Sequence, residues 1–316
     1  MAQPTNTFAT NDMIGEREDL SDVIYNIAPL DTPFLSSVAH TKATHTLHEW
    51  QTDTLNAAGE NAAIEGDDAP QTAGTATTRL TNPTQISTLD ARVSGTGRAV
   101  TPAGRADELD YQLLKRGHEL KRDMEYGLLA NHEKIAGNDT LARQYAAIGS
   151  WITTNTSKGT SGTDPTAADG TDPRNDGTQR VFTEDLLKDV LLQCATEGGN
   201  PDTLMVGAFN RQKVSGFAGG NTSMQKAEDK VLHTSFDVYE SDFGQLRVVF
   251  NRFQRSRDAL VLELDKWAIP FLTGRNMVTI DIAKTGDSDA KQILAEHTLE
   301  ARNEKASGIV ADLTTS

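Results

Sequence analysis

This 316-residue sequence has little cysteine, few basic residues relative to acidic ones, and no long apolar run. Its single cysteine excludes a disulfide framework and a cysteine-based zinc site. Acidic residues outnumber basic ones 45 to 30, for a formal charge of −15, which disfavours duplex binding by the chain as a whole. No run approaches the roughly eighteen apolar residues of a membrane span, and residues 1–10 lack the basic segment and apolar core of a secretory signal. We therefore expect a protein that is made in a reducing cytosol, is not exported by that route and has no membrane partner.

The motifs of common enzymes are also absent. The sequence contains no G-x-S-x-G elbow, no Walker A loop and no H-E-x-x-H zinc motif. Cys194 lies on an apolar helical stripe without a partner pattern, which indicates a buried structural thiol and not a nucleophile. We expect no enzymatic activity, no catalytic residue and no cofactor.

Two polar stretches bear a superficial likeness to metal sites. His40, His45 and His48 lie close in sequence, but their spacing in a polar arm favours a solvated surface. Four aspartates resemble a calcium loop only loosely: Asp164, Asp169, Asp172 and Asp176. Arg174 stands where such a loop requires an acid or an amide, so a plain linker is favoured and we expect no metal site.

The first forty-five residues have the pattern of an arm with two short helices. Ser21 is a cap for the first helix and Thr32 for the second. Pro33 follows at the one helical position where proline is tolerated.

Residues 46–55 and 84–93 have strand character, and the stretch between them does not. Residues 56–82 consist mainly of small, polar and acidic side chains, which cannot bury a core of their own. We therefore predict a long hairpin whose tip stands away from the body and needs a neighbour for support. The candidate subunit contacts in this hairpin are Trp50, Glu60, Glu65, Asp67 and Asp68.

The longest predicted helix covers residues 103–136 and ends at Gly137. At about 1.5 Å per residue it would be roughly 50 Å long. One face carries an apolar stripe and the other is charged, with Glu125 among the charged residues, so the helix is expected to lie across a body.

The second half of the chain alternates helices and strands. Residues 157–177 form a Gly/Thr/Asp/Pro linker, which marks a domain junction or a long surface loop. Helices are predicted at 183–197 and 210–217, and strands at 204–207, 234–239, 246–251, 260–264, 277–283, 293–304 and 309–313.

One basic cluster spans a strand end and a turn: Arg247, Arg252, Arg255 and Arg257. A solvated turn is the simplest interpretation. Salt bridges to an acidic neighbouring subunit are the second, and contact with nucleic acid is the third. All four arginines are candidate subunit contacts.

Three segments carry a resemblance to a known family. They are DLSDVIYNIAPLDTPFLSSV at 19–38, PDTLMVGAFNRQKVSGF at 201–217 and EHTLEARNEKASGIV at 296–310. In that order they resemble the amino-terminal arm, the axial-domain strand and helix, and the peripheral-domain closing strands of tailed-bacteriophage major capsid proteins. The order of elements over residues 14–313 is similar to that family as well.

The resemblance implies an α+β, Hong Kong 97-like capsid fold with an N-terminal arm, an extended β-hairpin loop, a long spine helix, and peripheral and axial domains. The arm would be 1–45 and the extended loop 46–100. Residues 101–182 would hold the spine helix and part of the peripheral domain with the Gly/Asp-rich linker. The axial domain would be 183–270, and 271–316 the closing strands of the peripheral domain.

The function implied by the resemblance is that of a structural subunit of an icosahedral phage head. Copies would assemble in the host cytoplasm into pentamers and hexamers of a closed shell, the virion capsid, around double-stranded DNA held without sequence-specific contact. A portal is an implied partner. Some relatives carry a scaffolding segment before the arm, and here the arm starts within about twenty residues, so the resemblance implies either a separate scaffold protein or trimming before this mature form. Residues 46–100 contain no lysine, so the lysine crosslinks of some relatives are not expected.

Three other functions compete with this one. An encapsulin-type bacterial nanocompartment would share the fold, and DNA inside the particle would separate the two. A surface-layer protein would also suit an acidic, cysteine-poor chain, but the missing export signal argues against it. An enzyme with an unrecognised site is the last, and a broad activity screen addresses it.

Overall fold

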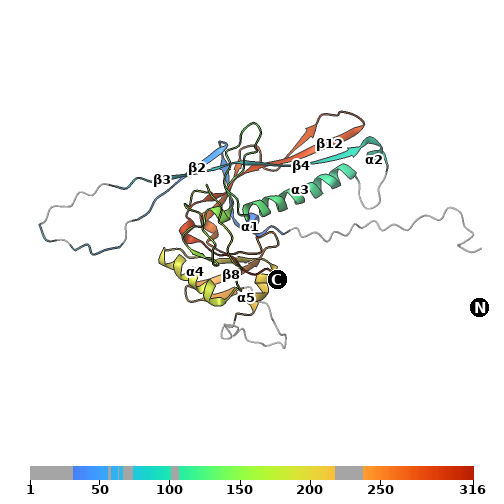
Figure 1. Cartoon of the computed structure of the whole chain (residues 1–316). Coiled ribbons are helices and arrows are strands. Elements are labelled where there is room, and N and C mark those ends of the chain that lie inside the picture. Colours follow the sequence, from blue (N-terminus) through green and yellow to red (C-terminus); the bar gives the residue numbers. More distant parts are fainter. Residues whose placement is uncertain (1–30, 56–57, 63, 67–73, 101–106, 218–237) are drawn as a thin grey trace, which may run out of the picture.

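The computed structural model describes residues 31–55, 58–62, 64–66, 74–100, 107–217 and 238–316. Helices and sheets combine in an α+β fold with a central body and two projections on opposite sides (Figure 1). One projection is the loop beyond strands β2 and β3, and the other carries β4, β12 and helix α3. The helices are α1 (Pro33–Ser37), α2 (Gly95–Ala99), α3 (Glu108–Leu128), α4 (Glu184–Thr196) and α5 (Ala208–Ser215).

The first sheet contains six strands, of which four follow the order β1-β10-β12-β11. In addition, β13 pairs with β10, and β4 pairs with β12 along ten residues. Its strands are β1 (Ala39–Ala43), β4 (Gln85–Ser94), β10 (Trp267–Leu272), β11 (Val278–Ile282), β12 (Ser288–His297) and β13 (Glu300–Ala301). Strands from both ends of the chain therefore meet in this sheet.

Helix α3 covers one face of the projecting part of this sheet. Leu109 of α3 packs with Ala91 and Val93 of β4. Gly117 faces Ile293 of β12, because a Cβ placed there would lie 3.7 Å from the Ile293 methyl. The helix is amphipathic, and the face opposite these contacts lies in solvent.

The second sheet, with the order β5-β14-β9-β6-β8-β7, packs against α4. Its strands are β5 (Thr156–Ser157), β6 (Thr203–Val206), β7 (Val238–Ser241), β8 (Gly244–Phe250), β9 (Ala259–Leu262) and β14 (Gly308–Val310). The predicted helix at 183–197 is confirmed, and its apolar stripe of Leu187, Val190, Leu191 and Cys194 is buried. Burial raises the pKa of the Cys194 thiol to about 12, which suits the structural role predicted for it.

A single core joins the two sheets. Met205 and Leu260 from the second sheet pack in the same cluster as Ile269 and Ile293 from the first. Trp151, which is fully buried, lies in this cluster as well. The body therefore folds around one continuous apolar core, with a smaller cluster under α4.

The predicted hairpin between 46–55 and 84–93 is wrong in its pairing. β2 (Leu47–Thr52) pairs with β3 (Thr78–Pro83), a strand in the stretch for which no regular structure was predicted. Trp50 lies opposite Leu80, and both pack against the main core. Leu80 thus supplies the apolar contact that holds this short ladder, while β4 is free to pair with β12.

The predicted helix 103–136 is too long at its C-terminal end. α3 ends at Leu128, which makes it about 30 Å long. Beyond it, the backbone bonds to other segments: Ala147 N–H donates to the His132 carbonyl, and Ile135 exchanges hydrogen bonds with Gln144. These tertiary hydrogen bonds end the helix before Gly137, and residues 101–106 at its other end lie outside the described residues.

Glu125, which was predicted to lie on the charged face of α3, is instead fully buried. Its carboxylate accepts the backbone N–H groups of Phe34 and Leu35, at 2.8 and 2.7 Å, and the side-chain amide of Asn251 at 2.6 Å. Desolvation is the main influence on this carboxyl group and raises its pKa, while the three hydrogen bonds act in the opposite direction. Thr32, the predicted cap of this helix, makes no side-chain cap hydrogen bond. Glu125 accepts the N–H groups at the start of α1 in its place, although it is about ninety residues away in sequence.

Several other predictions can be compared with the described residues. The helix capped by Ser21 lies outside them, and so does most of the strand at 234–239. The predicted strand at 293–304 is divided, since β12 ends at His297 and β13 covers two residues after a break. Sequence patterning missed β1 and β10, which pair in parallel.

Candidate subunit-contact surfaces

The three-stranded projection β11-β12-β4 has one covered face and one open face. Along β4, Ala91 and Val93 point to α3 and are buried, while Ile86 is 48% exposed. On β11, Ile280 and Ile282 are 43% and 36% exposed. Side chains alternate between the faces of a strand, so these isoleucines share the open side, away from α3. We call this open apolar side, built on Ile86, Ile280 and Ile282, the open sheet face.

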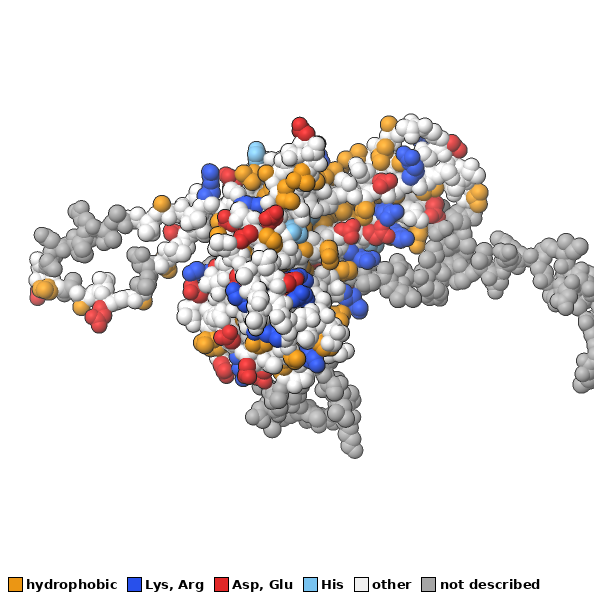
Figure 2. Space-filling view, viewed as in Figure 1, with side chains coloured by type: hydrophobic (Ala, Val, Ile, Leu, Met, Phe, Trp, Pro, Cys, Tyr) orange, Lys and Arg blue, Asp and Glu red, His pale blue; other side chains and the backbone are white. Residues whose placement is uncertain are grey.

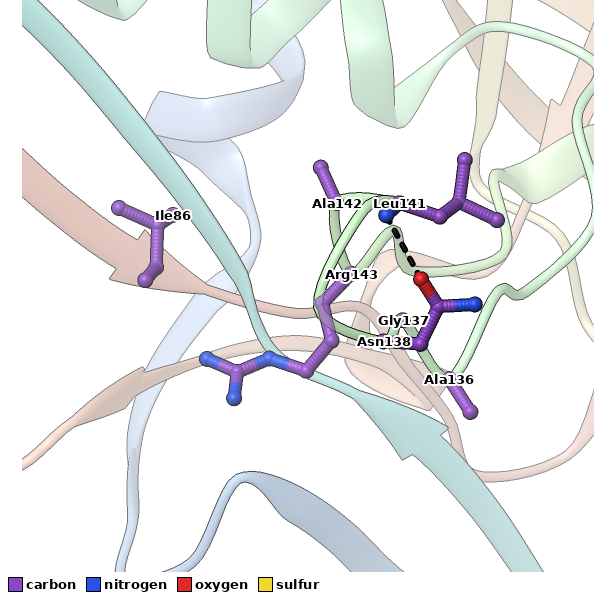
Figure 3. A pocket seen from close by; sticks show the side chains of 7 residues that line it. All are labelled: Ile86, Ala136, Gly137, Asn138, Leu141, Ala142 and Arg143. Carbon is purple, nitrogen blue, oxygen red and sulfur yellow. Dashed lines mark hydrogen bonds between the residues drawn. The ribbon is translucent and has the colours of Figure 1, made fainter.

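A groove of about 400 Å³ adjoins the open sheet face at Ile86 (Figure 3). Its other walls come from the turn at 136–143, in which Gly137 has a left-handed φ of 77°. The Asn138 side chain stabilises the turn by accepting the Leu141 N–H at 2.8 Å. Leu141 itself is 51% exposed and extends the apolar surface.

A buried ion-pair network supports the groove from below. Glu296 of β12 is almost fully buried and pairs with Arg143 and Arg275, each at 2.7 Å. It also accepts the Thr84 hydroxyl at 2.7 Å. Because three separate segments converge on one carboxylate, the groove wall is held rigidly to the sheet.

The loop beyond β2 and β3 is the second exposed apolar feature. Leu55 is 99% exposed and Ile64 is 80% exposed, so neither side chain packs on its own subunit. The candidate contacts Glu60 and Glu65 are exposed on the same loop, while Asp67 and Asp68 lie outside the described residues. Both aliphatic side chains are therefore available for contact with another molecule.

Trp50 was also a candidate subunit contact, and the structure places it against its own body. Its indole N–H donates to the Ala301 carbonyl at 2.8 Å, and its ring lies 5.4 Å from that of Trp151. His48, next to it, pairs with Glu300 at 3.1 Å. These contacts attach the base of the loop to the sheet.

The four arginines of the predicted basic cluster do not form one patch. Arg255 bonds to Asp176 and Asp258, and Arg257 bonds to Asp176 and Asp312, all within the chain. Arg252 instead lies over the Phe250 ring at 5.0 Å. Arg247 is exposed on β8. Arg255 and Arg257 thus have carboxylate partners within their own chain, whereas Arg247 and Arg252 form no ion pair with another described residue.

Asp312 organises the segment at 157–177. It has a left-handed φ of 59° and accepts the N–H groups of Gly159 and Gly177, at 3.0 and 2.7 Å. Arg174, which takes the place of a calcium ligand, is buried and pairs with Asp164. Within the part of the chain that the structure describes, no group of three or more His, Cys, Asp or Glu side chains could hold a metal ion. Nor does any described helix have the length and apolarity to cross a membrane.

Sequence patterning missed the open sheet face and the two loop aliphatics. The alternation of Val278, Ile280 and Ile282 with polar residues was a usable signal for one apolar strand face. It could not show that this face lacks a covering layer, because α3 covers the opposite side from a distant part of the chain.

Comparison with known proteins gives consistent results. Residues 3–314 match the SU10 major capsid protein family. The chain is 30% identical to the major capsid protein of Escherichia phage Phieco32, over 98% of this chain and 97% of that one. Among solved structures, the capsid asymmetric unit of cyanophage A-1(L) matches with a TM-score of 0.66 at 14% identity, covering 98% and 99% of the two chains. A structure from Gordonia phage Cozz matches with a TM-score of 0.62 at 10% identity, covering 99% and 98%.

The two solved structures match at 14% and 10% identity, so they show similarity of fold alone. The family match spans nearly the whole chain, and so does the similarity to the Phieco32 protein, which favours neither the encapsulin nor the surface-layer alternative. The chain therefore belongs to the SU10 major capsid protein family and is a structural shell subunit of a phage capsid.

Proposed function

We propose that this shell subunit has the domain arrangement of the Hong Kong 97 type. The arm would be 1–45 and the extended loop the part of 46–100 that precedes β4. Residues 101–182 and 271–316 would form the peripheral domain with α3 as its spine, and 183–270 the axial domain. The second sheet supports this division in part: β6, β7, β8 and β9 lie within 183–270, whereas β5 and β14 of the same sheet come from the peripheral segments.

The observation that carries the proposal is the position of two unpaired apolar surfaces. The loop with Leu55 and Ile64 leaves the body on one side, and the open sheet face projects on the other (Figure 1). One subunit cannot bring the two together within itself. In a head-to-tail arrangement, each loop lies over the open sheet face of the next copy, and such heterologous contacts close into rings. Pentamers and hexamers are the rings that we propose.

Charge supports the same pairing. The loop has no lysine or arginine from Ala43 to Thr78, and it presents Glu60 and Glu65. Arg92 is exposed on the side of β4 that carries Ile86, and it forms no ion pair with another described residue. An acidic loop tip and an unpaired arginine complement each other across such an interface.

The free energy contributed by one loop contact is modest, but a closed shell contains many copies of that contact. Full burial of one leucine or isoleucine side chain contributes about 1.5–3 kcal/mol. Each subunit would make this contact twice, once with its loop and once with its open sheet face, and ring closure repeats the contact around the capsomer. The fold of a single chain does not depend on it, because both loop side chains are exposed in the isolated subunit.

The remaining partners follow from the same function. The shell would assemble in the host cytoplasm and surround double-stranded DNA without sequence-specific contact. A separate scaffold protein and a portal stay predictions drawn from the resemblance. We expect no enzymatic activity, because the family is one of structural capsid proteins.

A double variant of the loop tests the proposal. Leu55→Asp with Ile64→Asp should abolish closed particles in negative-stain micrographs and in light scattering, while thermal unfolding of the subunit stays near wild type. The control is Leu192→Asp with Val181→Asp, which changes two aliphatics that are 52% and 55% exposed and lie outside both surfaces. Normal particle yield from the loop variant, or an equal loss in the control, would show that the loop is not the contact.

A reciprocal charge exchange sharpens the result. Arg92→Glu alone should lower particle yield, and Glu60→Lys with Glu65→Lys should restore it if the loop lies on this face. Restored yield assigns the partner surface, whereas continued loss with normally folded subunits would place the loop elsewhere on the neighbour.

A further inference from the structure

The solvent face of α3 carries cations that lack carboxylate partners. Lys115 and Lys121 are exposed there, and neither forms an ion pair with another described residue. Arg122 lies beside them, with its guanidinium 5.5 Å from the Phe253 ring and no described carboxylate within 4.0 Å. Elsewhere in the described chain, most lysines and arginines pair with an acid. Two acids are interleaved with these cations on α3: Glu119, which pairs with Arg116, and Asp123, which is exposed.

The turn below α3 extends the same surface. The Arg122 guanidinium lies over the ring of Phe253 in this turn. Arg252, which precedes Phe253, is exposed and lies over the Phe250 ring at 5.0 Å. Figure 2 shows Lys and Arg side chains gathered along α3 and below it, with acidic side chains between some of them. Aromatic faces hold both arginines without neutralising them. We call Lys115, Lys121, Arg122 and Arg252 the cationic strip.

We propose that the cationic strip is the surface through which the subunit contacts the phosphate backbone of double-stranded nucleic acid. The proposal rests on the proposed function, in which the shell surrounds DNA. A linear polyanion suits the strip because positions 115–122 span about 10 Å of helix. A duplex carries about six phosphate charges over that length. The chain's net charge of −15 repels DNA elsewhere, so the electrostatic free energy of bringing DNA to the surface is lowest at this strip.

The contact would carry no sequence information. Phosphate contacts position a protein on the duplex, whereas base contacts determine its sequence specificity. The strip lies on the side of one helix and one turn, and its exposed positions on the helix are flexible lysines. Its measurable signature is salt dependence, because each neutralised phosphate contributes a slope of about −0.9 to log K against log salt.

The test measures binding of a 30-base-pair duplex of arbitrary sequence to full-length capsomers by fluorescence anisotropy, between 50 and 200 mM salt. Lys115→Gln with Lys121→Gln should weaken binding at low salt and make the slope shallower by about 1.8. The control is Lys42→Gln with Lys213→Gln, which removes two cations of β1 and α5 that form no ion pair with another described residue and leaves the same net charge. It should keep the wild-type slope.

Three results would overturn the proposal. They are equal slopes in the two double variants, no binding by wild-type capsomers at 50 mM salt, or loss of particles by the strip variant with unchanged DNA binding. The last result would assign the strip to an acidic surface of a neighbouring subunit instead. Particle yield is recorded in the same preparations, so a failure of shell assembly in the wild type is distinguished from a failure of the DNA contact.

Discussion

The Glu125 carboxylate holds together three segments that lie far apart in the chain. From the last turn of α3, it bonds to the start of α1 and to Asn251. A buried donor that loses its acceptor costs about 1–3 kcal/mol, and Glu125→Ala leaves three such donors.

Glu125→Ala should therefore lower the free energy of subunit unfolding by about 3 kcal/mol or more in urea titrations at neutral pH. Glu119→Ala is the control on the same helix, since its pair with Arg116 is partly exposed and contributes about 0–1 kcal/mol. Similar small losses in both variants would contradict the role given to Glu125.

His297 gives the subunit a predicted sensitivity to acid. The ring is fully buried against Tyr145 and Phe271, and neither nitrogen has a hydrogen-bond partner. Desolvation lowers the pKa of His297 to about 3, from about 6.5 in the unfolded chain. The unfolded state thus binds more protons between these values, so the stability from this group is present above about pH 6.5 and is lost as the pH falls toward 3.

Between pH 7 and pH 5 the wild-type subunit should lose about 2 kcal/mol that the His297→Leu variant does not lose. Urea titrations of both proteins at the two pH values measure the difference. His45→Leu, which changes an exposed histidine, should keep the wild-type pH dependence. Parallel pH profiles for the wild type and His297→Leu would show that the buried ring does not titrate in this window.

At the scale of elements, the loop and the ladder at its base should behave differently. β2 and β3 form a ladder that Trp50 attaches to the core, whereas the described residues between β2 and β3 are exposed and have no strand partner. A ladder of two strands is marginal in water without such support.

Amide hydrogen exchange of free subunits should therefore be fast at 53–77 and slower at 78–83. In assembled particles, 53–77 should become protected while 78–83 changes little. Strong, equal protection of 53–77 in both states would mean that the subunit orders its own loop.

At the scale of the whole molecule, the shell should be held by non-covalent contacts. Residues 46–100 contain no lysine, so the loop has no amine with which to form an isopeptide bond to a neighbour. Particles boiled in detergent should migrate as a single band near 34.2 kDa on a gel. A ladder of multimers that resists reductant would contradict this, and mass spectrometry of the bands would then locate the bond.

Much of the local structure was predictable from the sequence, and so was the family. The buried stripe of α4 and the alternation in β11 follow from backbone periods of 3.6 and 2, which depend on neighbours a few positions away. Pro33 marks a helix start because its fixed φ and missing N–H are tolerated there. The lysine-free loop and the missing catalytic motifs are properties of composition alone.

Only the tertiary structure decided which surfaces are free. The partner of β4 lies about two hundred positions away in β12, Glu125 is buried by segments from both halves of the chain, and Arg255 and Arg257 find their acids in the 157–177 segment and at Asp312. A charge pattern cannot tell a solvated residue from one that meets a distant partner, because burial and pairing depend on packing between remote segments. For the same reason, the open sheet face and the cationic strip emerge only once it is known what covers each element and what does not.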